Sequence, residues 1–186
     1  MVGMLMKRVA GLRFSVSYTT RAPRGREVDG HEYFFITRQE FEQRLQRNEF
    51  LEWAEVFGNY YGTHQGELER AEREVVDLVL DIDVQGARQL KERIPGAVSI
   101  FILPPSRKEL EQRLRARSQD SEPVIERRLR EAAEEIRNYS QYDYVLVNRE
   151  VEASVETLGS IVEATRSRRE RMEREIRPIL ETFENA

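Results

Sequence analysis

The feature that most constrains the fold is an apolar run at residues 78–82, which ends in acidic residues and is followed at once by a helical pattern. The run is apolar except for Asp81, which is typical of a strand buried on both faces of a sheet. A second run of this kind, at 98–103, stops at a pair of prolines. Helices are predicted at 84–93, 107–117 and 124–138, and a last strand at 144–147. Strands that alternate with helices predict a parallel sheet and an α/β fold.

A different pattern occupies residues 33–63. Its strands, expected at 33–36 and 50–57, are short, alternate apolar with polar residues, and are separated by polar turns such as 58–63. Thr37 with Glu40 three residues later is a capping box, which predicts a helix between the two strands. We interpret this segment as a small insert beside the main sheet. A further strand is expected at 14–17, a helix at 65–74, and one long charged helix from Val151, bent or ended by Pro178.

Composition excludes several classes of function. The net charge of −4 gives no basic field to attract nucleic acid. The chain has no cysteine, so it forms no disulfide and no thiolate metal site. No apolar run approaches the roughly 18 residues that a membrane span requires. We therefore expect a cytoplasmic protein without nucleic acid or membrane as partner.

Two arginines form the first candidate site. Arg21 and Arg24 flank a proline just after the predicted strand that contains Ser17. Guanidinium groups hold phosphate through bidentate, charge-assisted hydrogen bonds, so this loop is a candidate phosphate site. The alternative is an ordinary surface loop with two solvated arginines.

A carboxylate among apolar residues forms the second candidate site. Glu52 lies in a strand that otherwise packs, and tyrosines that can donate hydrogen bonds to phosphate lie nearby in the sequence. One carboxylate can accept both donors of the guanine Watson–Crick edge, a pair that adenine does not offer. Glu52 would therefore select guanine; alternatively it is a strand-edge glutamate in solvent.

Asp81 and Asp83 form the third candidate site. They stand at the carboxyl end of the predicted strand at 78–82, where α/β sheets place their ligands. Buried carboxylates need a partner, which could be a base donor, a magnesium-bound water or an arginine. Gly86 opens the following helix and would let the backbone approach a ligand.

Arg113, Arg117 and Arg128 form the fourth candidate site. The first two are four residues apart and share a helix face, and the third comes from the next helix. Converging arginines suit a lid that closes on a phosphoryl group in transfer. The alternative is a set of solvated surface arginines, which are abundant in this chain. Neither His31 nor His64 is expected to act in catalysis, and no group of residues has metal-ligand spacing.

Several segments occur together and in order: SVSYTTRAPR, EVDGHEYFF, FLEWAEVFGNYYGT, LDIDVQGA, IFILPPS and DYVLVN. This series, over about residues 11–165, resembles the guanylate kinase family. The resemblance implies a P-loop nucleoside monophosphate kinase fold and the reaction ATP + GMP → ADP + GDP with Mg²⁺. It also implies one domain over 1–186, with a core (1–32, 64–104 and 140–186), a GMP-binding insert (33–63) and a lid (105–139).

The resemblance assigns roles by matching position. Ser17, Arg21, Arg24, Tyr33 and Tyr61 would hold the phosphate of GMP. Glu52, Thr63 and Asp83 would read the guanine, and Asp81 would lie near the phosphates. Arg113, Arg117 and Arg128 would be the lid arginines that meet ATP and the transferred group.

One family motif is missing from the sequence. The family begins with a strand and the loop GxxGxGKS or GxxGxGKT, whose backbone wraps the ATP phosphates, and nothing here fits it. By position, Met4 to Arg8 resembles the end of the helix that follows that loop. We therefore expect a chain that binds GMP without turnover, and a start assigned too late at Met1 would explain it. A non-catalytic module that binds GMP or phosphorylated peptides, and a truncated remnant, are the alternatives. The sequence does not indicate the oligomeric state.

Overall fold

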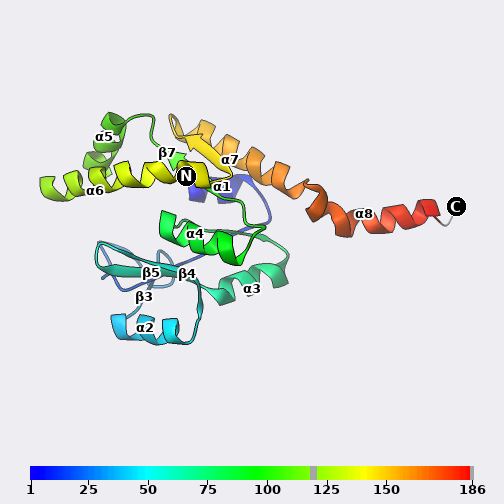
Figure 1. Ribbon diagram of the computed structural model, residues 1–186, viewed down its shortest axis with the longest axis horizontal. Helices are drawn as coiled ribbons and strands as arrows, with labels where there is room; N and C mark the ends of the chain where they lie inside the picture. The colour runs from blue at the N-terminus through cyan, green and yellow to red at the C-terminus, as the bar shows by residue number, and fades with distance from the viewer. Residues whose placement is uncertain (118–120, 185–186) are drawn as a thin grey trace. The chain divides into compact units, whose positions relative to one another are not determined.

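The structure is a computed structural model that describes residues 1–117 and 121–184 (Figure 1). The chain forms two compact units. One, here called the central unit, consists of Val9–Ser99 and Ala132–Asp143. The other, here called the terminal unit, consists of Met1–Arg8, Ile100–Glu131 and Tyr144–Ala186.

A four-stranded sheet in the central unit includes the strands of residues 33–63, the segment for which an insert is predicted. Its strands are β2 (Tyr18–Thr19), β3 (Phe34–Phe35), β4 (Phe50–Val56) and β5 (Asn59–His64), in the order β3-β2-β5-β4. The pair β2–β3 is parallel and the other two pairs are antiparallel. The prediction of a turn over 58–63 is wrong, because Asn59 already pairs with Val56 and the turn is only Phe57-Gly58. Both turn residues have positive φ (52° and 77°), as in the tightest hairpin loops.

Aromatic packing fixes this sheet against α2 (Arg38–Gln46). The predicted capping box is present, with Thr37 and Glu40 each bonding the backbone of the other. Phe41 of α2 is fully buried and stacks on Phe50 at 4.4 Å between ring centroids. At Gly62 an added Cβ would lie 3.0 Å from both rings, so a side chain here would press on this stack.

The outer edge of β4 is covered by α4 (Val84–Arg93), the helix predicted at these residues. Gln89 Nε2 donates to the Trp53 carbonyl (2.7 Å) and its Oε1 accepts from the Trp53 N–H (3.2 Å). Arg93 donates to the carbonyls of Phe50 and Leu51. These side chains take the place of a neighbouring strand, which satisfies the edge and orients α4 along β4.

The central unit also contains the parallel pair β1 (Leu12–Phe14) and β6 (Asp77–Val79), with α3 (Gln65–Glu74) packed beside β6. The prediction of a strand at 14–17 is wrong. Strand β1 ends at Phe14 and strand β2 of the four-stranded sheet begins at Tyr18, so residues 15–17 connect two sheets. The strand expected at 78–82 ends at Val79 and is half-buried, not buried on both faces. The following residues, 80–83, run without regular pairing to the start of α4.

The terminal unit is built on the parallel pair β7 (Ile100–Leu103) and β8 (Tyr144–Val147). Its helices are α1 (Val2–Arg8), α5 (Arg107–Arg117), α7 (Val151–Arg166) and α8 (Arg169–Glu184). Most of α6 (Glu122–Glu135) also belongs to this unit. The last residues of α6 and the short 3₁₀ helix η1 (Ile136–Gln141) that follows belong to the central unit. The buried side chains include Leu5, Ile125, Leu129, Val155 and Leu158. Parallel strands with helices between them confirm the predicted α/β class. None of the described helices combines the length and the apolar character that crossing a membrane demands.

The single long helix predicted from Val151 is in fact two helices. The break lies at 167–168, and Pro178 stands inside α8. Both the N–H and the hydroxyl of Ser167 donate to the Glu163 carbonyl, and Arg168 donates to Thr165, which tightens the turn. The break lies well before Pro178, so the proline does not cause it.

Candidate functional site

A buried carboxylate is the centre of the candidate site. Glu52 lies on β4 and is only 3% exposed. Burial raises the pKa of Glu52 above its usual range, with Asp83 adding to the effect and Thr63 opposing it. Among the described residues no arginine or lysine contributes to this balance. A carboxylate buried without a cation is costly, so the site is suited to a ligand that brings hydrogen-bond donors.

Thr63 lies next to Glu52 on the neighbouring strand. The two residues are register partners on β4 and β5, and Thr63 is fully buried. Its hydroxyl is near enough to favour the charged form of Glu52, but it makes no hydrogen bond of good geometry to any described residue. A buried hydroxyl in this position retains the capacity to bond a ligand.

The start of α4 closes this site on one side. Asp83 is the N-cap of α4, where Oδ1 accepts from the Gly86 N–H (2.9 Å) and Oδ2 accepts from Gln85 (3.1 Å). Gly86 is buried against Glu52, and an added Cβ would collide with the Glu52 carboxylate. Glycine is therefore required at position 86. Asp83 caps α4 through its bond from the Gly86 N–H and also lies beside Glu52.

A second cluster gathers around Arg21. Its guanidinium donates to Glu27 at 2.8 Å and to the Ala22 carbonyl at 2.7 Å. It lies 5.4 Å from the centre of the Tyr33 ring, and Tyr61 also interacts with it. The hydrogen bond to Glu27 raises the pKa of Arg21 despite partial burial. The loop therefore presents a fixed cation next to two phenols.

The two tyrosines meet edge to face. The Tyr33 and Tyr61 rings are 5.8 Å apart between centroids, at 68°. Burial raises the pKa of Tyr33, with a contribution from Asp81, so this hydroxyl stays protonated and able to donate. Asp81 is thus close enough to Tyr33 to affect it electrostatically, although its own side chain is exposed.

Ser17 and Arg24 stand at the margins of this cluster. Ser17 is half-buried, and its carbonyl accepts from the Phe34 N–H at 2.9 Å. Arg24 is exposed, and its backbone N–H donates to Glu27 at 2.7 Å. The nine predicted residues of the central unit therefore fall into a carboxylate part around Glu52 and a cationic part around Arg21.

Glu27 is a residue that the sequence reasoning missed. It receives hydrogen bonds from the Arg21 side chain and from the Arg24 backbone, so it organises the whole loop. The bond from Arg21 lowers the pKa of Glu27, which keeps it charged. A signal was present, because Glu27 lies three residues after Arg24, the spacing of a tight turn.

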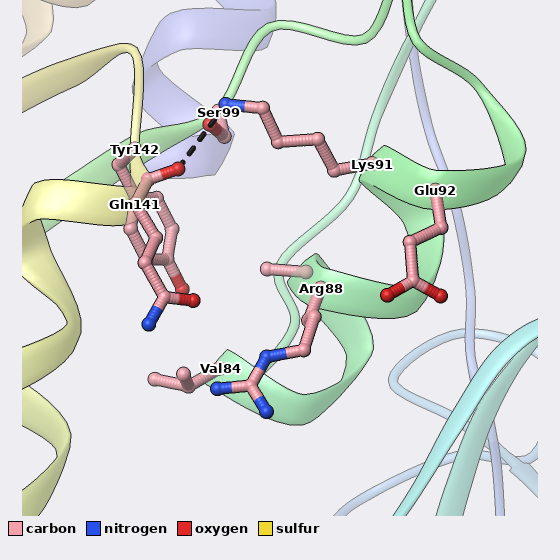
Figure 2. A pocket seen from close by; sticks show the side chains of 8 residues that line it. Val84, Arg88, Lys91, Glu92, Ser99, Gln141 and Tyr142 are labelled. Carbon is pink, nitrogen blue, oxygen red and sulfur yellow. Dashed lines mark hydrogen bonds between the residues drawn. The ribbon is translucent and has the colours of Figure 1, made fainter.

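The pocket shown in Figure 2 adjoins Asp83, since the lining residue Val84 directly follows it and Asp83 contributes to the raised pKa of Tyr142, which is due first to burial. It measures about 180 Å³ and is lined by Val84, Ala87, Arg88, Lys91, Glu92, Ser99, Gln141 and Tyr142. None of the predicted site residues lines it. Lys91 spans it, donating to the Gln141 carbonyl and to Asp143, both at 3.1 Å. We interpret the pocket as a gap in the packing of α4 against 141–142.

Comparison with known proteins decides the family. The family model described as guanylate kinase matches residues 4–165. The chain belongs to the guanylate kinase family.

Several relatives carry the same name. The guanylate kinase of Koribacter versatilis is 55% identical over 189 residues, which cover 99% of this chain and 81% of that protein. The guanylate kinase of Geobacter metallireducens is 55% identical over 157 residues, covering 84% of this chain and 77% of that protein. A crystal structure of guanylate kinase from Anaplasma phagocytophilum superposes with a TM-score of 0.78 at 37% identity, over 90% of this chain and 81% of that one. The fold is therefore the guanylate kinase fold.

The three arginines predicted for the guanylate kinase lid lie in the terminal unit. Arg113 of α5 donates to Glu109 (2.9 Å) and to the carbonyl of Arg149 (3.4 Å). Arg128 of α6 is half-buried and already has an interaction with the rest of the chain. Arg117 ends α5, and its side chain lies outside the described part of the structure. Arg113 is thus fixed to the loop after β8, and a convergence of all three arginines stays a prediction.

Proposed function

We propose that this chain binds GMP and serves the ATP-dependent phosphorylation of GMP to GDP. The observation that carries the proposal is Glu52, a buried carboxylate that has no cationic partner among the described residues and is paired in register with a buried threonine. Guanine supplies the ring N–H and the exocyclic amine, two donors that one carboxylate accepts together. The names of the relatives support the same reaction.

In this proposal the guanine lies against Glu52, Thr63 and Asp83. Both hydrogen-bond donors of the guanine edge reach the Glu52 carboxylate. They replace the water that burial removes, and so they stabilise the charged form of Glu52. The Thr63 hydroxyl bonds the base because it has no full partner among the described residues. Gly86 keeps the space open, since a side chain there would displace Glu52.

The phosphate of GMP then lies at the cationic cluster. Arg21 is held by Glu27 but has further N–H donors, and a guanidinium binds phosphate by two parallel hydrogen bonds. Tyr33 and Tyr61 donate from their hydroxyls without adding charge. Further assigned contacts are Arg24 and Ser17, with Asp81 beside the phosphates.

ATP is the proposed second substrate, and Arg113, Arg117 and Arg128 are proposed to stabilise the transferred phosphoryl group. Catalysis of this kind rests on positioning and on positive charge around the equatorial oxygens. Mg²⁺ is expected to arrive with ATP and to neutralise its phosphates. Among the described residues no group of three or more acidic, cysteine or histidine side chains gathers as a metal ion would require. We propose a cytoplasmic location, where both nucleotides are available.

We further propose that residues 1–186 supply the GMP site and the lid of this reaction, and that turnover also requires a phosphate-binding loop, without which these residues alone bind GMP but do not turn over. No segment of residues 1–186 matches GxxGxGKS or GxxGxGKT, the loop whose backbone N–H groups hold the ATP phosphates. The proposed domain plan remains one kinase domain with an insert over 33–63 and a lid over 105–139. The measurement is coupled detection of ADP with GMP and MgATP present, and an ordinary kinase rate would contradict this proposal.

The binding proposal is tested by titrating GMP calorimetrically into the chain and into Glu52→Gln. Loss of two charge-assisted hydrogen bonds predicts that affinity falls on the order of 100-fold. Glu55→Gln is the matched control, because Glu55 is on the same strand but exposed. Equal GMP affinity in all three proteins would sink the assignment of Glu52.

A non-catalytic module that binds phosphorylated peptides is the second candidate. The cationic cluster around Arg21 would serve a phosphopeptide as well as a nucleotide. Such a module has no use for a buried Glu52, so its binding would not change in Glu52→Gln. A phosphoserine peptide that binds more tightly than GMP, and equally well in both proteins, would favour this candidate.

A further inference from the structure

The helix α8 carries an apolar stripe that is open to solvent. None of the residues Arg169–Glu184 is buried, and the exposed fractions of Ile179, Leu180 and Phe183 are 53%, 54% and 76%. In Figure 1 α8 continues from the end of α7 in the terminal unit. Large apolar side chains on one helix face, all exposed, indicate a surface that another molecule covers.

The stripe has the spacing of a helix–helix seam. Met172, Ile176, Ile179 and Phe183 follow each other at intervals of four, three and four residues, and Leu180 lies beside them. This is the a/d repeat of helices that pack side by side over two heptads. The family match ends at residue 165, so α8 lies outside the part shared by the family model.

The charges on α8 indicate which molecule covers its apolar stripe. Residues 169–177 contain four arginines and three glutamates, whereas 178–184 contain two glutamates and no basic residue. Two copies in antiparallel orientation would set the basic half of each against the acidic half of the other. Helices that lie on membranes have a basic polar face, but α8 has four arginines against five glutamates. We propose that α8 is a dimerisation helix that pairs antiparallel with α8 of a second copy of this chain.

The seam also sets the register of the pair. Met172 of one copy packs against Phe183 of the other, and Ile176 against Ile179. In this register Arg169 comes opposite Glu184 of the second copy, on the same flank of the stripe. Arg169 pairs with its neighbour Glu170 at 3.1 Å, and the two side chains are 79% and 69% exposed. Such an exposed pair is weak, so Arg169 can exchange partners at little cost.

The first test is sedimentation velocity on the full 186-residue chain between about 1 and 100 µM, since a short two-helix interface is in the weak class. We expect a concentration-dependent dimer. Ile176→Ala with Ile179→Ala should raise the dissociation constant by at least about 100-fold, because four core side chains per dimer are lost. Arg174→Ala with Glu181→Ala is the matched control on the opposite helix face and should leave the dimer intact.

A charge exchange tests the orientation. Arg169→Glu and Glu184→Arg should each weaken the dimer, and the two together should restore it, because the pair is re-formed with reversed sign. A double variant that stays weak overturns the antiparallel arrangement. A monomer at all concentrations, or a dimer insensitive to the isoleucine changes, overturns the proposal. Binding of a monomeric chain to phosphatidylserine vesicles would overturn it too, and would identify the stripe as a lipid contact.

Discussion

Individual residues determine the proposed selectivity. Burying the Glu52 carboxylate costs free energy. Among the described residues its neighbours are Thr63, Asp83 and Gly86, and none of these is a cation. The sequence identified Glu52 because an acidic residue interrupted a packed strand. It did not identify Glu27, because the three-residue spacing from Arg24 indicates a turn but not that the glutamate accepts a hydrogen bond from Arg21.

The raised pKa of Glu52 predicts a pH dependence of the ligand-free chain. The folded pKa of this carboxyl lies above its unfolded value of about 4.5. The contribution of Glu52 to the free energy of unfolding is therefore most favourable at low pH, where Glu52 is protonated in both the folded and the unfolded chain. That contribution is lost as pH rises from the unfolded value through the folded pKa. Glu52→Gln stays neutral, so its stability advantage over the unaltered chain should grow between about pH 4.5 and pH 8. Urea unfolding of both proteins across this range measures it, and a constant or shrinking difference would contradict the burial argument.

At the scale of elements, local signals succeeded where one segment decided its own structure. The capping box at Thr37 and the helix at 84–93 were predicted as observed. Prediction failed where a distant partner decided, as for β5, which pairs with β4 over residues expected to form a turn. The break at 167–168 was missed because Pro178 is the stronger sequence signal, although the structure keeps Pro178 inside α8.

One long-range contact between elements gives a stability prediction. Asp143 accepts from the N–H and hydroxyl of Ser99 (both 2.8 Å) and from Lys91 (3.1 Å), which joins 132–143 to the rest of the central unit. Although burial raises the pKa of Asp143, these bonds lower it overall. Its stabilisation is therefore present above the unfolded pKa and lost as pH falls through the folded one.

Replacing the carboxylate should weaken this junction. Asp143→Asn is expected to reduce the free energy of unfolding by about 1–2 kcal/mol at pH 7, because charge-assisted bonds become neutral ones. Chemical denaturation at pH 7 and at pH 3 should show the difference shrinking at the lower pH. A difference that is equal at both values would mean that the charge of Asp143 is not what stabilises the contact.

At the scale of the whole molecule, the sequence predicted the α/β class because buried strands alternate with helices, and its ordered motifs predicted the family. The relatives and the guanylate kinase structure confirm both. The division of the chain into two units could not be predicted, since it depends on segments far apart in sequence that pack together. The roles of the site residues remain a proposal that the geometry around Glu52 supports.

The most direct measurement of the central claim is calorimetric titration of the chain with GMP, IMP and AMP. IMP keeps the ring N–H but lacks the exocyclic amine, and AMP lacks the donor pair, so a carboxylate that reads guanine separates all three. The account predicts that GMP binds more tightly than IMP by about 10-fold and that AMP binds more weakly still, since each lost bond to a charged group costs about 1.5–3 kcal/mol. Equal affinity for the three nucleotides, or no binding of GMP, would contradict the account.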